Sequence, residues 1–256
     1  MARCKYKFLG AYHNFMCPFE VEEGSEYCFW HQEIEEKRPS KEQLNLLKEN
    51  EIIGVFLPKV NFNFADLRGI NLILANLKGS SFYKANLRKA NLNPANLQDS
   101  DLREANLEDA YLPRADLQGA EFFRTNLKGA CLIFARLENY SLTTVNFQNA
   151  DLRYANLTNS DLSGANLSRV NLEYATLENA KLRGCKLIEA NLLFSHISKS
   201  DLAHSDLSGA DLSYADIRQA SLVGTIFDSK SILEDTKELE RNNLRNAFFN
   251  SNEIME

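Results

Sequence analysis

From Val60 to Ser229, apolar and polar positions recur with a period of five residues. The repeat forms 34 units in one unbroken frame. The third residue of each unit, here called the centre, is always apolar: Leu in 27 units, Phe in five and Ile in two. The first residue is usually small, with Ala in 20 units, and the second is Asn or Asp in 22. Such a strict internal repeat decides the fold before local propensities do.

A period of five fits neither a helix nor a flat strand. On a helix, successive centres would be rotated by about 140°, so they would define no apolar face. On a strand they would point to opposite sides, because side chains alternate and five is odd. Every centre stays inside only if the chain turns a corner once per unit. The centre and the small first residue then line a narrow tube, and Asn or Asp bonds the backbone of the turn. We therefore predict an all-β solenoid.

The segment Ala-Asn-Leu-Lys-Gly at 75–79, with its many variants along the chain, resembles the repeats of the pentapeptide repeat proteins. The resemblance covers about two-thirds of the chain. It implies a right-handed quadrilateral β-helix with four units per coil, and therefore about eight coils over residues 60–229. It implies little about function, because one fold hosts many functions.

The charge of the chain argues against a partner that is a nucleic acid. The formal net charge is −6, and residues 51–228 contribute only −2 of it, with 18 basic and 20 acidic residues. A nucleic-acid-binding rod would carry a basic face. No apolar run reaches membrane-spanning length, so we expect no membrane association. The N-terminus lacks the apolar region of a signal peptide, and we expect a cytoplasmic protein. Its five Cys should then remain free of disulfides.

Residues 1–39 form a separate segment that is rich in Cys and His. Cys28 and His31 have the short spacing with which two ligands hold one Zn²⁺, and Cys4 and Cys17 complete a tetrahedral Cys₃His set. A site closed by four protein ligands is structural, and its binding energy substitutes for the core that this segment lacks. The segment also resembles the short zinc-binding segments that precede some pentapeptide repeat domains.

Two other interpretations of this segment stay open. His13 is a competing ligand. Alternatively, the three thiols are buried without a metal, because free Cys packs as a small hydrophobic residue. The aromatic residues that would surround them are Tyr6, Phe8, Phe15 and Trp30.

Short capping helices are predicted at both ends of the solenoid, because terminal coils expose unpaired strand edges. In the lead-in at 40–59, Ser40 and Gln43 have the spacing of a capping box, and Leu44 and Leu47 give the helix an apolar edge. An imperfect apolar edge predicts a second helix at 230–256. From the family resemblance we also expect a homodimer contact through the C-terminal end.

Outward positions that are four units apart should stack in columns if each coil holds four units. One column ends in five aromatic residues: Phe134, Tyr154, Tyr174, Phe194 and Tyr214. The column is either a strip that binds a protein partner, as exposed aromatic stripes often do, or a stack that stabilises adjacent coils.

One departure from the repeat predicts a local distortion. Tyr140 occupies an inward position that elsewhere holds a small residue. Cys131 and Arg136 replace the Asn or Asp of nearby units. We expect a bulge or a changed turn between residues 131 and 144.

The sequence shows no catalytic constellation, and a tube filled with Leu leaves no interior pocket. We therefore expect a non-enzymatic scaffold that presents a rigid rod face to a protein partner. The resemblance supplies one alternative, a DNA mimic that modulates DNA gyrase or topoisomerase IV, although such mimics need a more acidic rod. A second alternative is a nucleic-acid-binding zinc module with the rod as a spacer.

Overall fold

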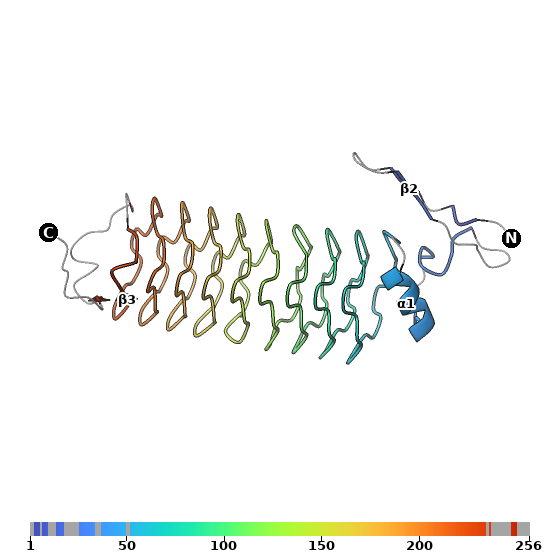
Figure 1. Ribbon diagram of the computed structural model, residues 1–256, viewed down its shortest axis with the longest axis horizontal. Coiled ribbons are helices and arrows are strands. Elements are labelled where there is room, and N and C mark those ends of the chain that lie inside the picture. The colour runs from blue at the N-terminus through green and yellow to red at the C-terminus, as the bar shows by residue number, and fades with distance from the viewer. Residues whose placement is uncertain are drawn as a thin grey trace.

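The computed structural model describes residues 3–5, 7–9, 14–17, 26–33, 37–49, 52–233, 236 and 247–249. In these ranges the chain forms one elongated solenoid with small elements at its two ends (Figure 1). The helix and strands are β1 (Lys7–Leu9), β2 (Asn14–Met16), α1 (Lys41–Glu49), β3 (Ile226–Phe227) and β4 (Phe248–Phe249). The helix α1 lies at the N-terminal end of the solenoid, and β3 lies at its C-terminal end (Figure 1).

Parallel backbone bridges join each coil to the next. The second residue of a unit pairs with its equivalent four units later, as Asn76 does with Asn96. The ladder runs from Phe56 to Ile232, and one bridge follows another from unit to unit except at two places described below. The predicted all-β solenoid with four-sided coils is therefore confirmed. Its coils begin shortly before Val60, so residues 54–233 hold about nine coils of four units each.

The inward positions form one continuous core along the rod. Every centre from Phe62 to Phe227 is at most 4 % exposed. Where Ser or Thr replaces Ala at the first position, its hydroxyl can find a backbone acceptor. Thr125 Oγ1, for example, donates to the carbonyl of Leu102 in the preceding coil at 2.8 Å. This bond satisfies a polar group that would otherwise be costly to bury.

Each corner is a turn, and the residue at the fifth position of the unit usually adopts the left-handed backbone conformation. Of the 34 fifth positions from 64 to 229, 31 have a positive φ, eight of them being Gly. A positive φ at the third residue of a turn is the signature of type II. The exceptions are Pro94, Thr144 and Ser229. Proline fixes φ near −65°, and a β-branched residue strongly disfavours the left-handed region, which explains the first two.

Replacing Asn149 (φ 59°) with Val should destabilise the rod by about 1–2 kcal/mol, because the branched side chain makes the left-handed conformation costly. Replacing Asn149 with Gly should change the stability by only a few tenths of a kcal/mol, since Gly adopts this conformation without strain. Urea unfolding of both variants compares the two costs. Equal stability of the Val and Gly variants would contradict the role assigned to this turn.

The N-terminal end of the solenoid is capped as the sequence predicted. The main-chain N–H of Ser40 donates to Gln43 Oε1 at 2.8 Å, and Gln43 N–H donates to Ser40 Oγ at 3.2 Å, so the capping box is confirmed. Leu47 of α1 is fully buried. Lys48 Nζ binds the carbonyl of Asp66 at 2.8 Å and so ties the helix to the first coils.

The C-terminal end differs from the prediction. Phe248 and Phe249 form strand β4, which pairs in parallel with β3, so the helix predicted at 230–256 is wrong at these residues. The repeat ends here because Asp211 pairs with Ile232, one residue beyond the regular spacing. Residues 234–235, 237–246 and 250–256 lie outside the described residues, as does most of the surface expected to form a homodimer. In the part of the chain that is described, no helix is long and apolar enough to span a membrane.

The predicted distortion is present around Tyr140. Between Phe56 and Ile232 only two bridges of the ladder are missing. The missing pairs are Asp116 with Arg136 and Glu121 with Ser141. The turn at Thr144 also changes, and Thr144 Oγ1 accepts a hydrogen bond from Arg124 N–H at 2.8 Å. We call this opening between two coils the seam.

Candidate functional site

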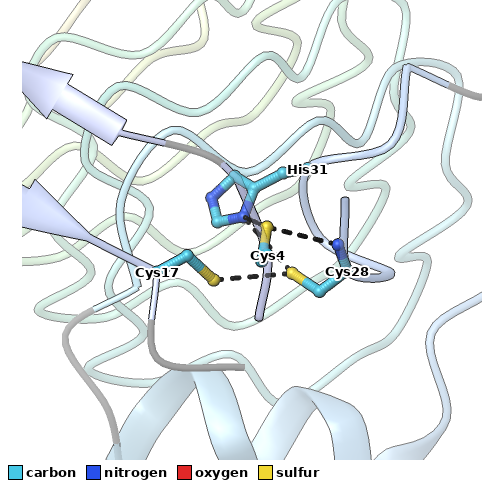
Figure 2. Close-up of side chains that lie close together, drawn as sticks. All are labelled: Cys4, Cys17, Cys28 and His31. Carbon is cyan, nitrogen blue, oxygen red and sulfur yellow. Dashed lines mark hydrogen bonds between the residues drawn. The ribbon is translucent and has the colours of Figure 1, made fainter. Parts of the chain in front are cut away.

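The four predicted metal ligands come together at the N-terminal end of the solenoid (Figure 2). Strands β1 and β2 pair antiparallel, with Lys7 opposite Met16. This pairing brings Cys4, just before β1, close to Cys17, just after β2. Cys28 and His31 lie in one tight turn, in which His31 N–H donates to the Cys28 carbonyl at 2.9 Å.

The cluster has the size of a tetrahedral metal site. The ligand atoms of all four residues lie within 4.8 Å of one another. Cys17 Sγ is 3.6 Å from Cys28 Sγ, and His31 Nδ1 is 3.3 Å from Cys28 Sγ and 3.7 Å from Cys4 Sγ. Sulfur ligands at about 2.3 Å from a tetrahedral zinc would be about 3.8 Å apart. The four residues are 4–7 % exposed, so the cluster could hold a buried metal ion.

The surroundings of the cluster orient these ligands. His31 Nε2 lies 2.9 Å from the carbonyl of Ile53, so Nε2 carries the proton and leaves the Nδ1 lone pair toward the sulfurs. The main-chain N–H of Cys28 donates to Cys4 Sγ at 3.3 Å. The hydrogen bond from the Cys17 thiol to Cys28 Sγ lowers the pKa of the Cys28 thiol to about 4. Cys28 is therefore a thiolate at neutral pH, the form that binds metals.

Lys37 is a buried cation beside the cluster, and nothing in its sequence context indicates its role. It is 7 % exposed, and burial lowers its pKa to about 8. Its ammonium donates to the carbonyls of Phe29, Gln32 and Phe56 at 2.5, 2.5 and 3.1 Å. Lys37 thus joins the Cys28–His31 turn to the first coil, and its charge stabilises the thiolate of Cys28.

The five aromatic residues predicted to form a column are stacked along one corner of the rod. Successive ring centroids lie 4.9, 5.1, 5.0 and 5.0 Å apart, and the interplanar angles are 3–19°. Phe134, Tyr154, Tyr174 and Tyr214 are 40–47 % exposed. Arg114 lies over the free face of Phe134, 5.2 Å from its centroid. Ring faces are therefore covered by their neighbours, and the ring edges face outward.

The sequence model of the pentapeptide repeats matches residues 59–93, 95–129, 130–169, 165–202 and 190–228, in 8 copies. The chain belongs to the pentapeptide repeat family. Its solenoid is accordingly a right-handed quadrilateral β-helix, as the resemblance implied. The match ends where the C-terminal register ends, and it does not include the Cys₃His cluster.

Solved structures of other pentapeptide repeat proteins are similar to this chain. HetL from the cyanobacterium Nostoc, a protein involved in heterocyst differentiation regulation, is 28% identical over 86% of this chain and 100% of its own, with a TM-score of 0.32. A second Nostoc pentapeptide repeat protein is 29% identical over 41% of this chain and 84% of its own, with a TM-score of 0.38. QnrB1, a plasmid-mediated fluoroquinolone resistance protein, is 21% identical over 78% and 84%, with a TM-score of 0.23. No curated protein sequence matches significantly.

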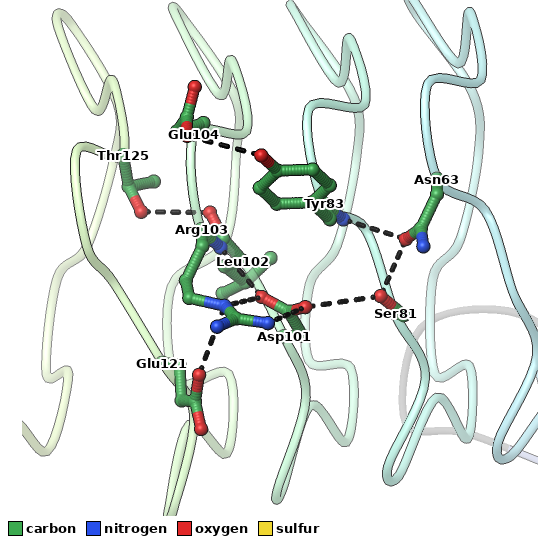
Figure 3. A network of polar contacts seen from close by, with 9 residues as sticks. All are labelled: Asn63, Ser81, Tyr83, Asp101, Leu102, Arg103, Glu104, Glu121 and Thr125. Carbon is green, nitrogen blue, oxygen red and sulfur yellow. Dashed lines mark hydrogen bonds and ion pairs between the residues drawn. The ribbon is translucent and has the colours of Figure 1, made fainter.

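The surface of this pentapeptide repeat rod also carries polar contacts within and between coils, and Figure 3 shows one such network. Arg103 Nε donates to Asp101 Oδ1 at 2.8 Å and lies 3.1 Å from a Glu121 carboxylate oxygen of the next coil. The Arg103 hydrogen bond holds the pKa of Asp101 below its usual range. Tyr83 donates to Glu104 at 3.3 Å. The Arg103 side chain is 47 % exposed, so solvent screens these pairs and each contributes little to stability.

Two alternatives were predicted for the N-terminal segment of this pentapeptide repeat protein: His13 as a metal ligand, and thiols packed among aromatic residues. The structure describes only some of the residues concerned. His13 and Tyr6 lie outside the described residues, and so do the side chains of Phe8 and Phe15. Trp30 is 3 % exposed, and its carbonyl accepts a hydrogen bond from Phe56 N–H at 2.7 Å. The segment therefore adds a rung to the first coil and shields its open edge.

Proposed function

We propose that this chain is a non-enzymatic scaffold protein that works in the cytoplasm and binds a protein partner through the aromatic column. The observation that carries the proposal is the continuous strip of five stacked rings, of which all but the partly buried Phe194 are exposed. Its four ring-to-ring spacings place Phe134 and Tyr214 about 20 Å apart. Aromatic residues are enriched at protein interfaces, where they supply contact area at a low entropic cost.

Stabilisation of the coils alone accounts poorly for this strip. A stacked pair contributes about 0.5–1.5 kcal/mol beyond burial. Asn columns already join coils elsewhere in the rod, as Asn146 does with Asn126 at 3.0 Å, without exposing apolar surface. Leu193 and Ile133 flank the rings and are partly exposed, so the strip is wider than one side chain. The outward ring edges favour packing against a protein surface over base stacking, which needs free ring faces.

We further propose that the Cys₃His cluster binds structural Zn²⁺. Thiolate and imidazole ligands in a closed tetrahedral arrangement are typical of zinc. Three thiolates and one Zn²⁺ leave a net charge of −1, and the buried ammonium of Lys37 lies where it can balance that charge. The metal would lock the N-terminal segment onto the first coil and leave the aromatic column free.

The alternatives have less support. A DNA mimic requires an acidic surface, whereas residues 51–228 carry a net charge of −2. Many of the rod's carboxylates form ion pairs with Lys or Arg side chains, as Glu189 does with Arg169 at 2.7 Å. The same balance of charge disfavours binding to nucleic acid by the rod.

The triple variant Tyr154→Ser, Tyr174→Ser, Phe194→Ser should lose its partner, because it removes the middle of the strip. We expect the partner to co-purify with the tagged wild-type chain from its native host and to be absent with the triple variant. The measurement is quantitative mass spectrometry of the co-purified proteins, with circular dichroism to verify the fold.

The matched control changes exposed aromatic residues on other columns, Tyr111→Ser with Phe123→Ser, which are 48 % and 51 % exposed. This double variant should keep the partner. Retention of the partner by the triple variant, or its loss from the control as well, would move the interface away from the column.

A further inference from the structure

At the seam, one interface between coils lacks main-chain hydrogen bonds on two of its four sides. Each unit forms one side of a coil. In a regular interface it bonds to the equivalent unit of the next coil, as Leu77 N–H does to the Asn96 carbonyl at 2.8 Å. No main-chain hydrogen bond joins residues 115–124 to residues 135–144, all of which lie in the described range 52–233. The two missing bridges belong to these same two sides.

The other two sides of this interface are paired as in the rest of the rod. Leu127 N–H donates to the Asn146 carbonyl at 2.8 Å, and Leu132 N–H donates to the Asp151 carbonyl at 2.7 Å. The paired sides follow each other along the chain, and so do the open ones. The interface is therefore joined along one half and open along the other.

Hydrogen bonds mark both ends of the open half. Before it, Arg114 N–H donates to the Ile133 carbonyl at 3.0 Å, and after it, Arg124 N–H donates to Thr144 Oγ1 at 2.8 Å. Between these two points the open half turns one corner, at Gly119. The two coils thus stay in contact, but the backbone joins them over half of the usual perimeter.

Tyr140 accounts for the open half. Its hydroxyl donates to the carbonyl of Leu117 at 2.5 Å, and its ring packs edge-on against Phe122 with centroids 5.7 Å apart. A phenol ring at a position that usually holds Ala keeps the two coils from reaching the regular strand spacing of about 4.8 Å. One hydroxyl and one ring contact therefore stand where a regular interface has two sides of backbone ladder.

Two cavities border Tyr140, one at each open side. The first, of about 710 Å³, is lined in part by Asp116 and Phe134, and the second, of about 290 Å³, is lined in part by Glu121 and Thr143. Side chains that face empty space lack the packing contacts that join neighbouring coils elsewhere. The interface therefore loses packing as well as hydrogen bonds.

We propose that the seam divides the rod into two cooperative blocks, residues 54–134 and 135–233, which open independently of each other. The stability of a repeat protein is approximately a sum of repeat terms and of interface terms between neighbours, so a weak interface uncouples the coils on its two sides. Local opening follows such cooperative units. The inference does not depend on a partner for the aromatic column, because every contact that defines it lies in the rod.

The two candidate sites fall largely into different blocks. The Cys₃His cluster adjoins the first block, whereas four of the five rings of the column, Tyr154 to Tyr214, lie in the second. The coils behind these rings can then open without disturbing the N-terminal end. The seam in this way insulates one site from conformational changes at the other.

Phe147→Ala tests the proposal by weakening the second block beside the seam. The probes are the amides of Leu107 and Leu187, two coils before and two coils after Phe147, which are bonded to the next coil at 2.8 and 2.7 Å. Exchange at Leu187 should accelerate at least about tenfold and exchange at Leu107 less than about twofold, because opening of a block stops at its boundary. The measurement is native-state hydrogen exchange of the full-length protein by NMR.

Leu127→Ala is the mirror control, in the coil just before the seam. Its probes are the amides of Leu87 and Leu167, again two coils away on each side and bonded to the next coil at 2.7 and 2.8 Å. Here exchange at Leu87 should accelerate and exchange at Leu167 should stay as in the wild type. The opposite directions of the two variants separate a boundary at the seam from a general difference between the ends of the rod.

Tyr140→Ala should couple the two blocks, because Ala is the commonest residue at this position, in 20 of 34 units, and lets the open sides pair. In this background Phe147→Ala should accelerate exchange at Leu107 and Leu187 to a similar extent, and circular dichroism verifies the fold. The proposal is overturned if Phe147→Ala affects both amides equally while Tyr140 is present, or if Leu107 stays unaffected once Tyr140 is replaced. The comparison of Phe147→Ala with Leu127→Ala decides on its own if Tyr140→Ala does not fold.

Discussion

Replacing Cys28 with Ser should remove about one equivalent of zinc per chain, because a hydroxyl cannot take the place of a thiolate in a structural Cys₃His site. Structural zinc contributes about 10–16 kcal/mol of apparent binding free energy in small zinc-dependent segments. The N-terminal segment should therefore lose its packing against the first coil. Elemental analysis of protein purified in reductant gives the metal content, and limited proteolysis reports on the segment.

The matched control for this experiment is Cys185→Ser. Cys185 is also buried, at 1 % exposed, and burial raises the pKa of its thiol to about 12. Its Sγ donates to the carbonyl of Leu162 at 2.9 Å, inside the rod and remote in sequence from the cluster. The control should keep its metal. A wild-type chain without metal, or zinc that persists in Cys28→Ser, would leave the cluster as a set of packed thiols.

Replacing Phe147 with Ala should destabilise the rod by about 3–5 kcal/mol, because it leaves a cavity where the chain has no freedom to collapse. Phe147 is fully buried, and its main-chain N–H is bonded to the next coil at 2.9 Å. In a repeat protein each coil contacts only its neighbours, so the loss should also divide the unfolding transition. Urea unfolding followed by circular dichroism measures both effects.

Phe147→Leu is the control, because Leu is the centre of most units. It should cost less than about 1.5 kcal/mol, as expected for a hydrophobic substitution that keeps most of the volume. If Phe147→Ala were as stable as Phe147→Leu, the core would be looser at this coil than the burial of Phe147 indicates.

The repeat made the fold predictable because its period leaves one geometry that keeps every Leu inside. The same reasoning placed the column of rings, since it depends only on the number of units per coil. The capping box at Ser40 and Gln43 was predictable from local chemistry. The Cys28 and His31 pair was predictable because the two ligands share one turn.

Other features depend on contacts that a sequence does not display. The pairing of β1 with β2, which brings Cys4 to Cys17, has no strong periodic signal in such short strands. Lys37 is buried because three carbonyls surround it, and nothing near it in the sequence indicates that. Strand β4 follows a long segment, and its parallel partner β3 is distant in the sequence. At Tyr140 the sequence predicted a local distortion. It did not predict which backbone bridges are lost, because each bridge depends on the positions of two neighbouring coils.

Each coil adds about the same length to the rod, so the number of coils between two sites sets the distance between them. The first bridge begins at Phe56, beside the Cys₃His cluster, and Arg136 lies four coils later, at the start of the aromatic column. With a strand spacing of about 4.8 Å, these two places are about 19 Å apart. Gain or loss of one whole coil between them would change that separation by about 4.8 Å and preserve their relative direction. Duplication or deletion of four consecutive units can therefore adjust the distance between the cluster and the aromatic column without rebuilding either site.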